Sequence, residues 1–152
     1  MSLTPYPNGA SVMGIPLVGA KNPFGSVLFV ASSGGSNANS GLDTSHPLKT
    51  IAKAISKGSA GDTIVLSSGT HSVDVSVSAL IPKTDMQFVA AIPPCGGKPS
   101  TIITHDADDG LTLVLVDVDG VGFYGIEFLL VAGGSTALEL VSASQTLSLI
   151  HI

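Results

Sequence analysis

The chain has 152 residues, of which 44% are hydrophobic and only 11% are charged. Its formal net charge is −5 with six basic residues, which argues against a phosphate-backbone partner, so we expect no nucleic-acid binding. Its 18 glycines and 9 prolines favour many short strands joined by turns, and therefore an all-β fold.

Residues 1–25 contain prolines and glycines at short intervals, so regular structure is disfavoured in this segment. We interpret it as an extended arm that lies either on its own domain or on a neighbouring subunit. Residues 26–31 are predicted to form a strand. Gly, Ser and Asn dominate residues 32–45, which predicts a surface loop.

One short amphipathic helix is predicted after this loop. Thr44 or Ser45 can cap it, and Pro47 suits an early helical position. Apolar residues recur at helical spacing, and glycines end the segment; the apolar residues are Leu48, Ile51, Ala52 and Ile55, and the glycines are Gly58 and Gly61. The apolar stripe is only about two turns long, so the helix must lie on another apolar surface.

The pattern then becomes repetitive. Four segments look equivalent, namely residues 63–66, 86–89, 121–124 and 146–149, and their starts differ by 23, 35 and 25 residues. The two shorter steps fit one coil of a solenoid, and the longer step is explained by a loop inserted at residues 93–99.

Further strands are predicted on the other faces of each coil, at residues 73–77, 101–104, 111–116 and 137–141. Alternation predicts one inward side, formed by Leu111, Leu113 and Leu115 in one strand and by Leu138 and Leu140 in another. We therefore predict an all-β, right-handed parallel β-helix of about three to four coils, with one short amino-terminal capping helix.

A family resemblance follows from the residues around the helix. Residues 29–31, 43–51, 61–66 and 69–71 resemble the opening of pectin-lyase-like right-handed β-helix proteins. The arm at residues 7–19 is similar to the start of β-helical proteins encoded by tailed bacteriophages. This resemblance implies a virion-associated structural protein. Enzymes of the family carry their catalytic residues on later coils, so no catalytic residue is carried over.

The last residues suggest that the chain is truncated. A solenoid needs a polar terminal cap, whereas residues 147–152 continue an apolar pattern. They also resemble a translated sequencing-adapter tail, in which case they are not native. We accordingly expect residues 26–152 to form the amino-terminal cap and first coils of the β-helix.

Acidic residues concentrate between positions 106 and 119, where calcium is the candidate ligand; they are Asp106, Asp108, Asp109, Asp117 and Asp119. The spacing from Asp106 to Asp117 matches the ends of a calcium loop. Its interior does not match, because Gly110 falls one position early and Leu111 occupies the glycine position. Solvated turns explain the acidic residues better than a metal site.

The other candidates also favour structural interpretations. His46, His71, His105 and His151 lack the spacing of a zinc site, and the lone Cys95 can complete neither such a site nor an intrachain disulfide. The glycine-rich residues 33–36 lack the Lys and Ser/Thr of a phosphate-binding loop. The aromatic residues are expected to form inward core ladders; they are Phe29, Phe88, Phe123 and Phe128.

The sequence nominates no catalytic, cofactor-binding or metal-binding residue. We expect a structural or surface-display component of a phage-like virion, which associates with itself or with other virion proteins. The alternative is the amino-terminal part of a polysaccharide-binding or polysaccharide-degrading protein that is extracellular or on the cell surface. No membrane partner is expected, because Glu127 interrupts the most apolar stretch, at residues 123–132.

Overall fold

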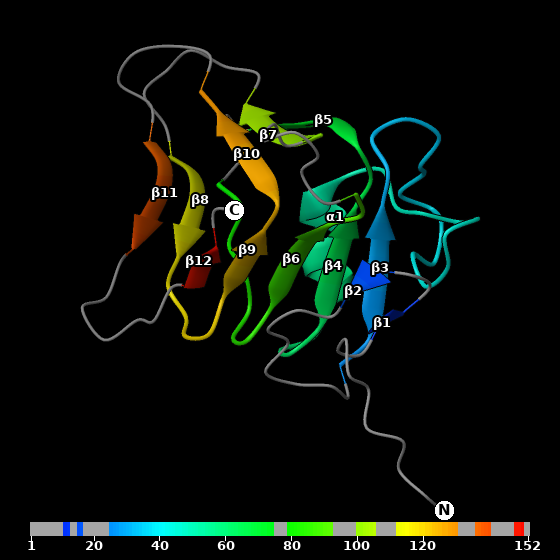
Figure 1. The fold of residues 1–152 in the computed structure, drawn as a ribbon, viewed down its shortest axis with the longest axis horizontal. Coiled ribbons are helices and arrows are strands. Elements are labelled where there is room, and N and C mark those ends of the chain that lie inside the picture. Colours follow the sequence, from blue (N-terminus) through cyan, green and yellow to red (C-terminus); the bar gives the residue numbers. More distant parts are fainter. Residues whose placement is uncertain are drawn as a thin grey trace, which may run out of the picture.

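The computed structural model describes residues 25–74, 79–92, 100–105, 112–130 and 136–140, and the backbone of short strands at 11–12, 15–16 and 148–150. In this part of the chain the structure is mostly strands with one short helix (Figure 1). The strands lie in two larger parallel sheets and one parallel pair, and a separate antiparallel pair joins β1 (Ser11–Val12) to β2 (Ile15–Pro16). The predicted all-β class is confirmed.

The largest sheet has five parallel strands in the order β12-β9-β6-β4-β3. These strands are β3 (Val27–Val30), β4 (Thr63–Leu66), β6 (Gln87–Ala90), β9 (Gly122–Tyr124) and β12 (Ser148–Ile150). The four segments predicted to be equivalent therefore pair side by side in one sheet. The predicted register was wrong by one residue at two steps, because Thr63 faces Gln87 and Gly122 faces Ser148.

In the remaining parallel sheets, too, the strands lie side by side in the order in which they occur along the chain. The second sheet has the order β10-β7-β5, and β11 pairs with β8. The strands are β5 (Gly69–Val73), β7 (Thr101–His105), β8 (Thr112–Val116), β10 (Ile126–Leu129) and β11 (Thr136–Leu140). The strand predicted at 73–77 overlaps β5 only at Val73, because the chain turns at Gly69, whose φ is 115°, soon after β4; residues 75–77 lie outside the described residues. The predicted inserted loop at 93–99 lies outside the described residues.

A ladder of turns sets the register of the five-stranded sheet. Gly61, Asp85 and Gly120 each stand two residues before a strand, with φ of 83°, 56° and 77°. The turns bond to one another, because Gly61 N–H donates to the Thr84 carbonyl at 2.9 Å and Asp85 N–H donates to the Asp119 carbonyl at 2.9 Å. Pairing between these turns explains why β6 begins at Gln87 rather than at the apolar Met86.

The core is built from the inward side chains of the sheets. The rings of Phe88 and Phe123 are stacked with centroids 4.8 Å apart, and Phe128 meets Phe123 edge-on at 5.3 Å. The predicted aromatic core is confirmed for these three residues. It was wrong for Phe29, which is buried but lies between two core residues, Leu28 and Val30, and so points to the opposite face of β3.

Inward alternation was only partly correct in β8. Leu113 is buried as predicted, but Leu115 is half-buried, while Val114 and Val116 belong to the core. Every position from 113 to 116 is apolar, so periodicity could not select the inward side. In β11, Leu138 packs against the core as predicted. Leu111 and the side chain of Leu140 lie outside the described residues.

The helix α1 (Ile51–Lys57) is shorter than predicted and has a different cap. Thr50, not Thr44 or Ser45, is the N-cap, and its hydroxyl accepts a hydrogen bond from Lys53 N–H at 3.3 Å. Leu48 is not helical, because its N–H donates to the Phe29 carbonyl and its carbonyl accepts from Ala31 N–H, both at 2.8 Å. The helix ends at Gly58, as predicted.

The helix buries its apolar face in the core, beside the outermost strands of the two larger sheets. Ile51 and Ile55 are buried as predicted, whereas Ala52 is exposed and Ala54 takes the buried position. The helix lies against β3 and β5 (Figure 1). Burial of this face stabilises a helix that is too short to persist by itself in water.

Candidate functional site

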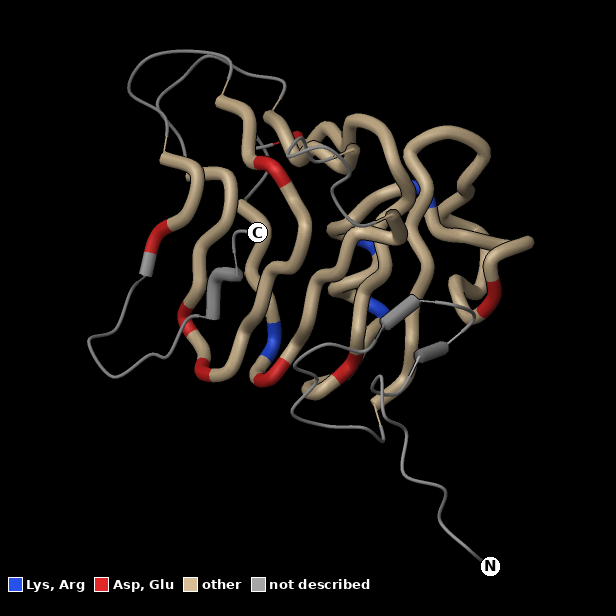
Figure 2. Tube along the Cα trace, in the orientation of Figure 1, with Lys and Arg blue, Asp and Glu red and all other residues tan. Residues whose placement is uncertain are grey.

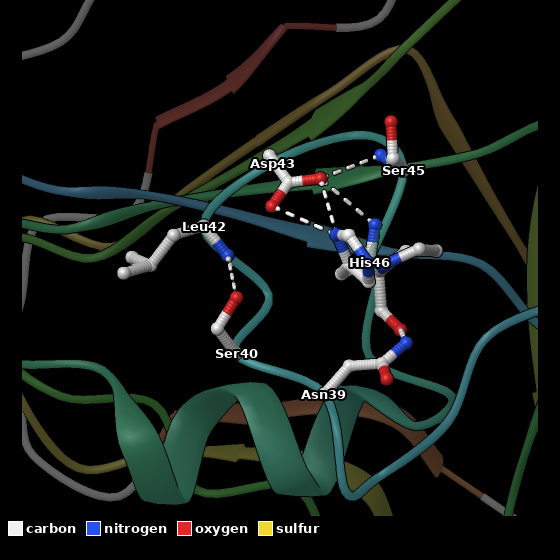
Figure 3. Close-up of polar contacts among 7 residues, drawn as sticks. Asn39, Ser40, Leu42, Asp43, Ser45 and His46 are labelled. Carbon is white, nitrogen blue, oxygen red and sulfur yellow. Dashed lines mark hydrogen bonds and ion pairs between the residues drawn. The ribbon is translucent and has the colours of Figure 1, made fainter.

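The segment that joins β3 to α1 is held by a polar turn (Figure 3). Asp43 Oδ1 accepts hydrogen bonds from the backbone N–H groups of Ser45 at 2.8 Å and His46 at 2.9 Å. The His46 ring Nδ1 lies 3.1 Å from the same oxygen. Desolvation favours a higher pKa for Asp43, but the hydrogen bonds from His46 and Ser45, with the charge of His46, together outweigh it and lower the pKa. Such a turn shapes an exposed loop.

This loop also closes the outer edge of β3. Phe29 N–H donates to the Gly41 carbonyl at 2.7 Å, and Leu48 forms an isolated parallel bridge with Val30. Asn37 then binds the start of the helix, because its side-chain oxygen accepts from the N–H groups of Lys49 at 3.2 Å and Thr50 at 3.1 Å. The loop therefore protects one sheet edge and positions the residues before α1.

A small half-open pocket lies between this segment and β5. Its volume is about 190 Å³. It is lined by Thr70, His71 and Ser72 of β5, by Lys49, Thr50 and Ile51 at the start of the helix, and by Ser32. The pocket is smaller than the ~300 Å³ at which sites for drug-sized ligands begin. It is half open to solvent, and most of the surface exposed inside it is apolar, with Lys49 and several hydroxyl residues among its lining side chains.

His71 is the most unusual residue of this pocket. Its side chain points inward and is only 2% exposed. One ring nitrogen, Nε2, lies 2.9 Å from the Ser67 carbonyl and donates to it, so the other nitrogen, Nδ1, carries a lone pair. Nδ1 is buried without a hydrogen-bond partner among the described residues. Burial lowers the pKa of His71, an effect that the bond to Ser67 only partly offsets. The imidazole is therefore neutral at pH 7.

Among the described residues, the candidate histidine and aspartate residues noted in the sequence do not form one cluster. His46 is exposed in the loop turn, while His71 and His105 are buried on neighbouring strands. Within the described residues, no three His, Cys, Asp or Glu side chains lie close enough to hold a metal. Asp117 follows β8 and Asp119 lies in the turn ladder. Five further candidates lie outside the described residues, namely Cys95, Asp106, Asp108, Asp109 and His151.

Charged groups are sparse over the described trace (Figure 2). Three of the six basic residues fall at 49, 53 and 57, around the helix. The Lys57 ammonium donates to the Asn39 carbonyl, whereas Lys49 lines the pocket. The sequence analysis counted the basic residues without noting this grouping, and the spacing of four residues between these lysines was the signal that could have revealed it. No helix among the described residues is long and apolar enough to cross a membrane.

Sequence reasoning also missed the pocket itself. Its β5 residues were noted only for their resemblance to β-helix openings. The available signal was the alternation of exposed hydroxyl residues, Thr70 and Ser72, around one buried histidine. That pattern predicts a strand with a polar outer side, but the pocket also depends on the helix segment, which is distant in sequence.

Comparison with known proteins gives one match. The family described as "Protein of unknown function (DUF1565)" matches residues 33–78, and that family is associated with right-handed β-helix proteins. The matched residues include most of the loop, α1, β4 and β5, and they contain every residue that lines the pocket except Ser32. No curated protein and no solved structure matches the chain significantly.

Proposed function

We propose that this chain is the helix-covered end of a right-handed parallel β-helix and serves as a structural or surface-display component of a phage-like virion. The observation that carries the proposal is the recurring strand order. β4, β6 and β9 belong to one parallel sheet, and the strands that follow them, β5, β7 and β10, belong to another. Parallel crossovers are almost always right-handed. The matched family supports this architecture.

The polar groups of the described strands support a structural role, because several of them hold the coils together. The Asp62 carboxylate accepts from Ser26 N–H at 2.8 Å and from Ser59 N–H at 2.7 Å. The buried Gln87 amide donates to the carbonyls of Asp85 at 3.0 Å and Gly120 at 2.7 Å. Side chains used in this way rigidify a stack of strands. The virion assignment rests on the resemblance of residues 7–19 to phage-encoded β-helical proteins.

A second candidate is polysaccharide binding on the outer face of the five-stranded sheet. Tyr124 is half-buried there, and a Cβ added to Gly122 would lie 2.7 Å from the Tyr124 ring. Gly122 thus leaves space for the Tyr124 ring and for the Gln87 side chain, whose amide oxygen would lie 2.3 Å from the same Cβ. A partly exposed tyrosine presents an apolar ring with a polar tip, and both suit a sugar.

Two experiments separate these functions. Particles purified from the source culture on a density gradient should contain peptides of this chain at a level comparable to that of other structural proteins. Absence from intact particles, with the protein in the particle-free fraction, would refute the virion role. A glycan array probed with wild type and Tyr124→Ala tests the second candidate. Binding that Tyr124→Ala abolishes would favour it over the structural role.

A further inference from the structure

The two larger sheets each have an edge strand near the helix, β3 in one sheet and β5 in the other, and only the edge of β3 is covered by the chain's own loop. The outer edge of β3 is covered by the chain's own loop, through the hydrogen bonds of Phe29 and the Leu48 bridge. The second sheet ends at β5, and no described strand pairs with its outer edge. After β3 the chain makes the loop and helix instead of a strand beside β5. The pocket lies beside this edge, between β5 and the start of the helix.

The outer edge of β5 presents backbone groups as well as side chains. Gly69 N–H donates to the Ser100 carbonyl at 2.8 Å, so this N–H faces β7. Because successive residues of a strand direct their N–H groups to opposite edges, those of Thr70 and Ser72 face away from β7. Both residues are exposed and line the pocket. This edge can therefore hydrogen-bond to an added strand.

The charge at this edge favours an acidic partner. Lys49 is exposed and lines the pocket, and Lys53 lies one helical turn beyond it. No acidic residue lines the pocket, although the chain as a whole has a net charge of −5. A partner chain with carboxylates would meet an opposite charge here and would be repelled elsewhere on the molecule.

We propose that the outer edge of β5 binds an extended acidic peptide segment of a partner protein by strand addition. The backbone of that segment pairs with Thr70 and Ser72, and a carboxylate approaches Lys49. This is a recurrent way in which proteins bind extended segments. The inference holds whether or not the protein is part of a virion, because it rests on the strand edge and its charge.

The first test uses a short capped peptide of alternating valine and glutamate, with a valine and lysine peptide of equal length as the control. In titrations of the ¹⁵N-labelled full chain, the acidic peptide should shift the amide signals of Thr70 and Ser72 and slow their hydrogen exchange. Added salt should weaken binding. Equal binding of both peptides, or no binding of the acidic one at millimolar concentration, would overturn the proposal.

Two variants at one position test the backbone pairing. Ser72→Pro removes the outward N–H, which an edge strand tolerates, and should weaken acidic-peptide binding about tenfold or more. Ser72→Ala keeps the N–H and should bind like wild type. Unchanged binding by a folded Ser72→Pro protein would exclude strand addition at this edge.

A charge variant keeps the proposal testable if Ser72→Pro does not fold. Lys49→Glu changes an exposed side chain, so we expect the protein to stay folded. It should lose affinity for the acidic peptide and gain affinity for the lysine peptide. Retained preference for the acidic peptide would show that Lys49 does not contribute to the site.

Discussion

Gly120 offers a direct test of the turn ladder, because replacement with alanine combines two separable costs. The φ of Gly120 is 77°, and the left-handed region costs a residue with a Cβ about 1–2 kcal/mol. The added Cβ would also lie 1.9 Å from Asp85 Oδ1, so the carboxylate or the turn must move. Such overpacking costs about 1–3 kcal/mol more. We expect Gly120→Ala to lower the free energy of unfolding by about 3 kcal/mol.

The matched control is Gly34→Ala. Gly34 has a similar φ of 83°, but no atom lies within 4 Å of its added Cβ, so only the backbone cost applies. Thermal denaturation followed by circular dichroism should show a Tm loss of roughly 2–8 °C for Gly34→Ala and a larger loss, roughly 6–12 °C, for Gly120→Ala. Equal losses would refute the contact between the two turns. In the Asp85→Gly background, Gly120→Ala should cost less, since the opposing carboxylate is gone.

Three further predictions concern the helix, the core and the buried histidine. Ile51→Asp places an unpaired carboxylate on the buried helix face and should lower the free energy of unfolding in urea by about 3–5 kcal/mol. Ala52→Asp on the exposed face should lower it by less than about 0.5 kcal/mol. Similar losses for the two variants would contradict the helix orientation. Phe88→Ala removes a stacked core ring and should cost about 3–5 kcal/mol, and a loss below about 1 kcal/mol would argue against that packing. Because burial lowers the pKa of His71, its neutral form stabilises the fold fully above pH 6.5, and this contribution is lost as pH falls through 6.5 toward the folded pKa. The Tm of wild type should therefore fall more than that of His71→Gln between pH 8 and pH 5, and equal falls would show that His71 is not buried in its neutral form.

The strands were predictable because each combines an apolar run with turn residues at its start. Residues 63–66 follow Gly61 and residues 122–124 follow Gly120, so local chemistry marks both the turn and the strand. The exact register of the five-stranded sheet was harder to predict from the sequence. It depends on Asp85 adopting a positive φ, which hydrogen bonding to the next turn enforces and which sequence propensity does not predict.

The helix cap and the pocket depended on contacts between distant segments. Three residues could cap the helix by their chemistry, namely Thr44, Ser45 and Thr50. Thr50 is the cap because Leu48 pairs with β3 and so cannot be part of the helix. The alternation of Thr70, His71 and Ser72 is compatible with a strand that has one inward residue, but the pocket beside it also needs the helix segment, which is distant in sequence. Local sequence chemistry identified the elements, whereas tertiary pairing determined their ends and the site between them.

The turn ladder also decides where the chain can change length. The equivalent turn residues are separated by 24 positions from Gly61 to Asp85 and by 35 from Asp85 to Gly120, yet the strands after them pair in register. Each turn resets the alignment, so extra residues added after a strand do not displace the next one. Segments inserted between the sheets, away from these turns, could therefore diverge freely in length and chemistry while the stacked strands stay the same.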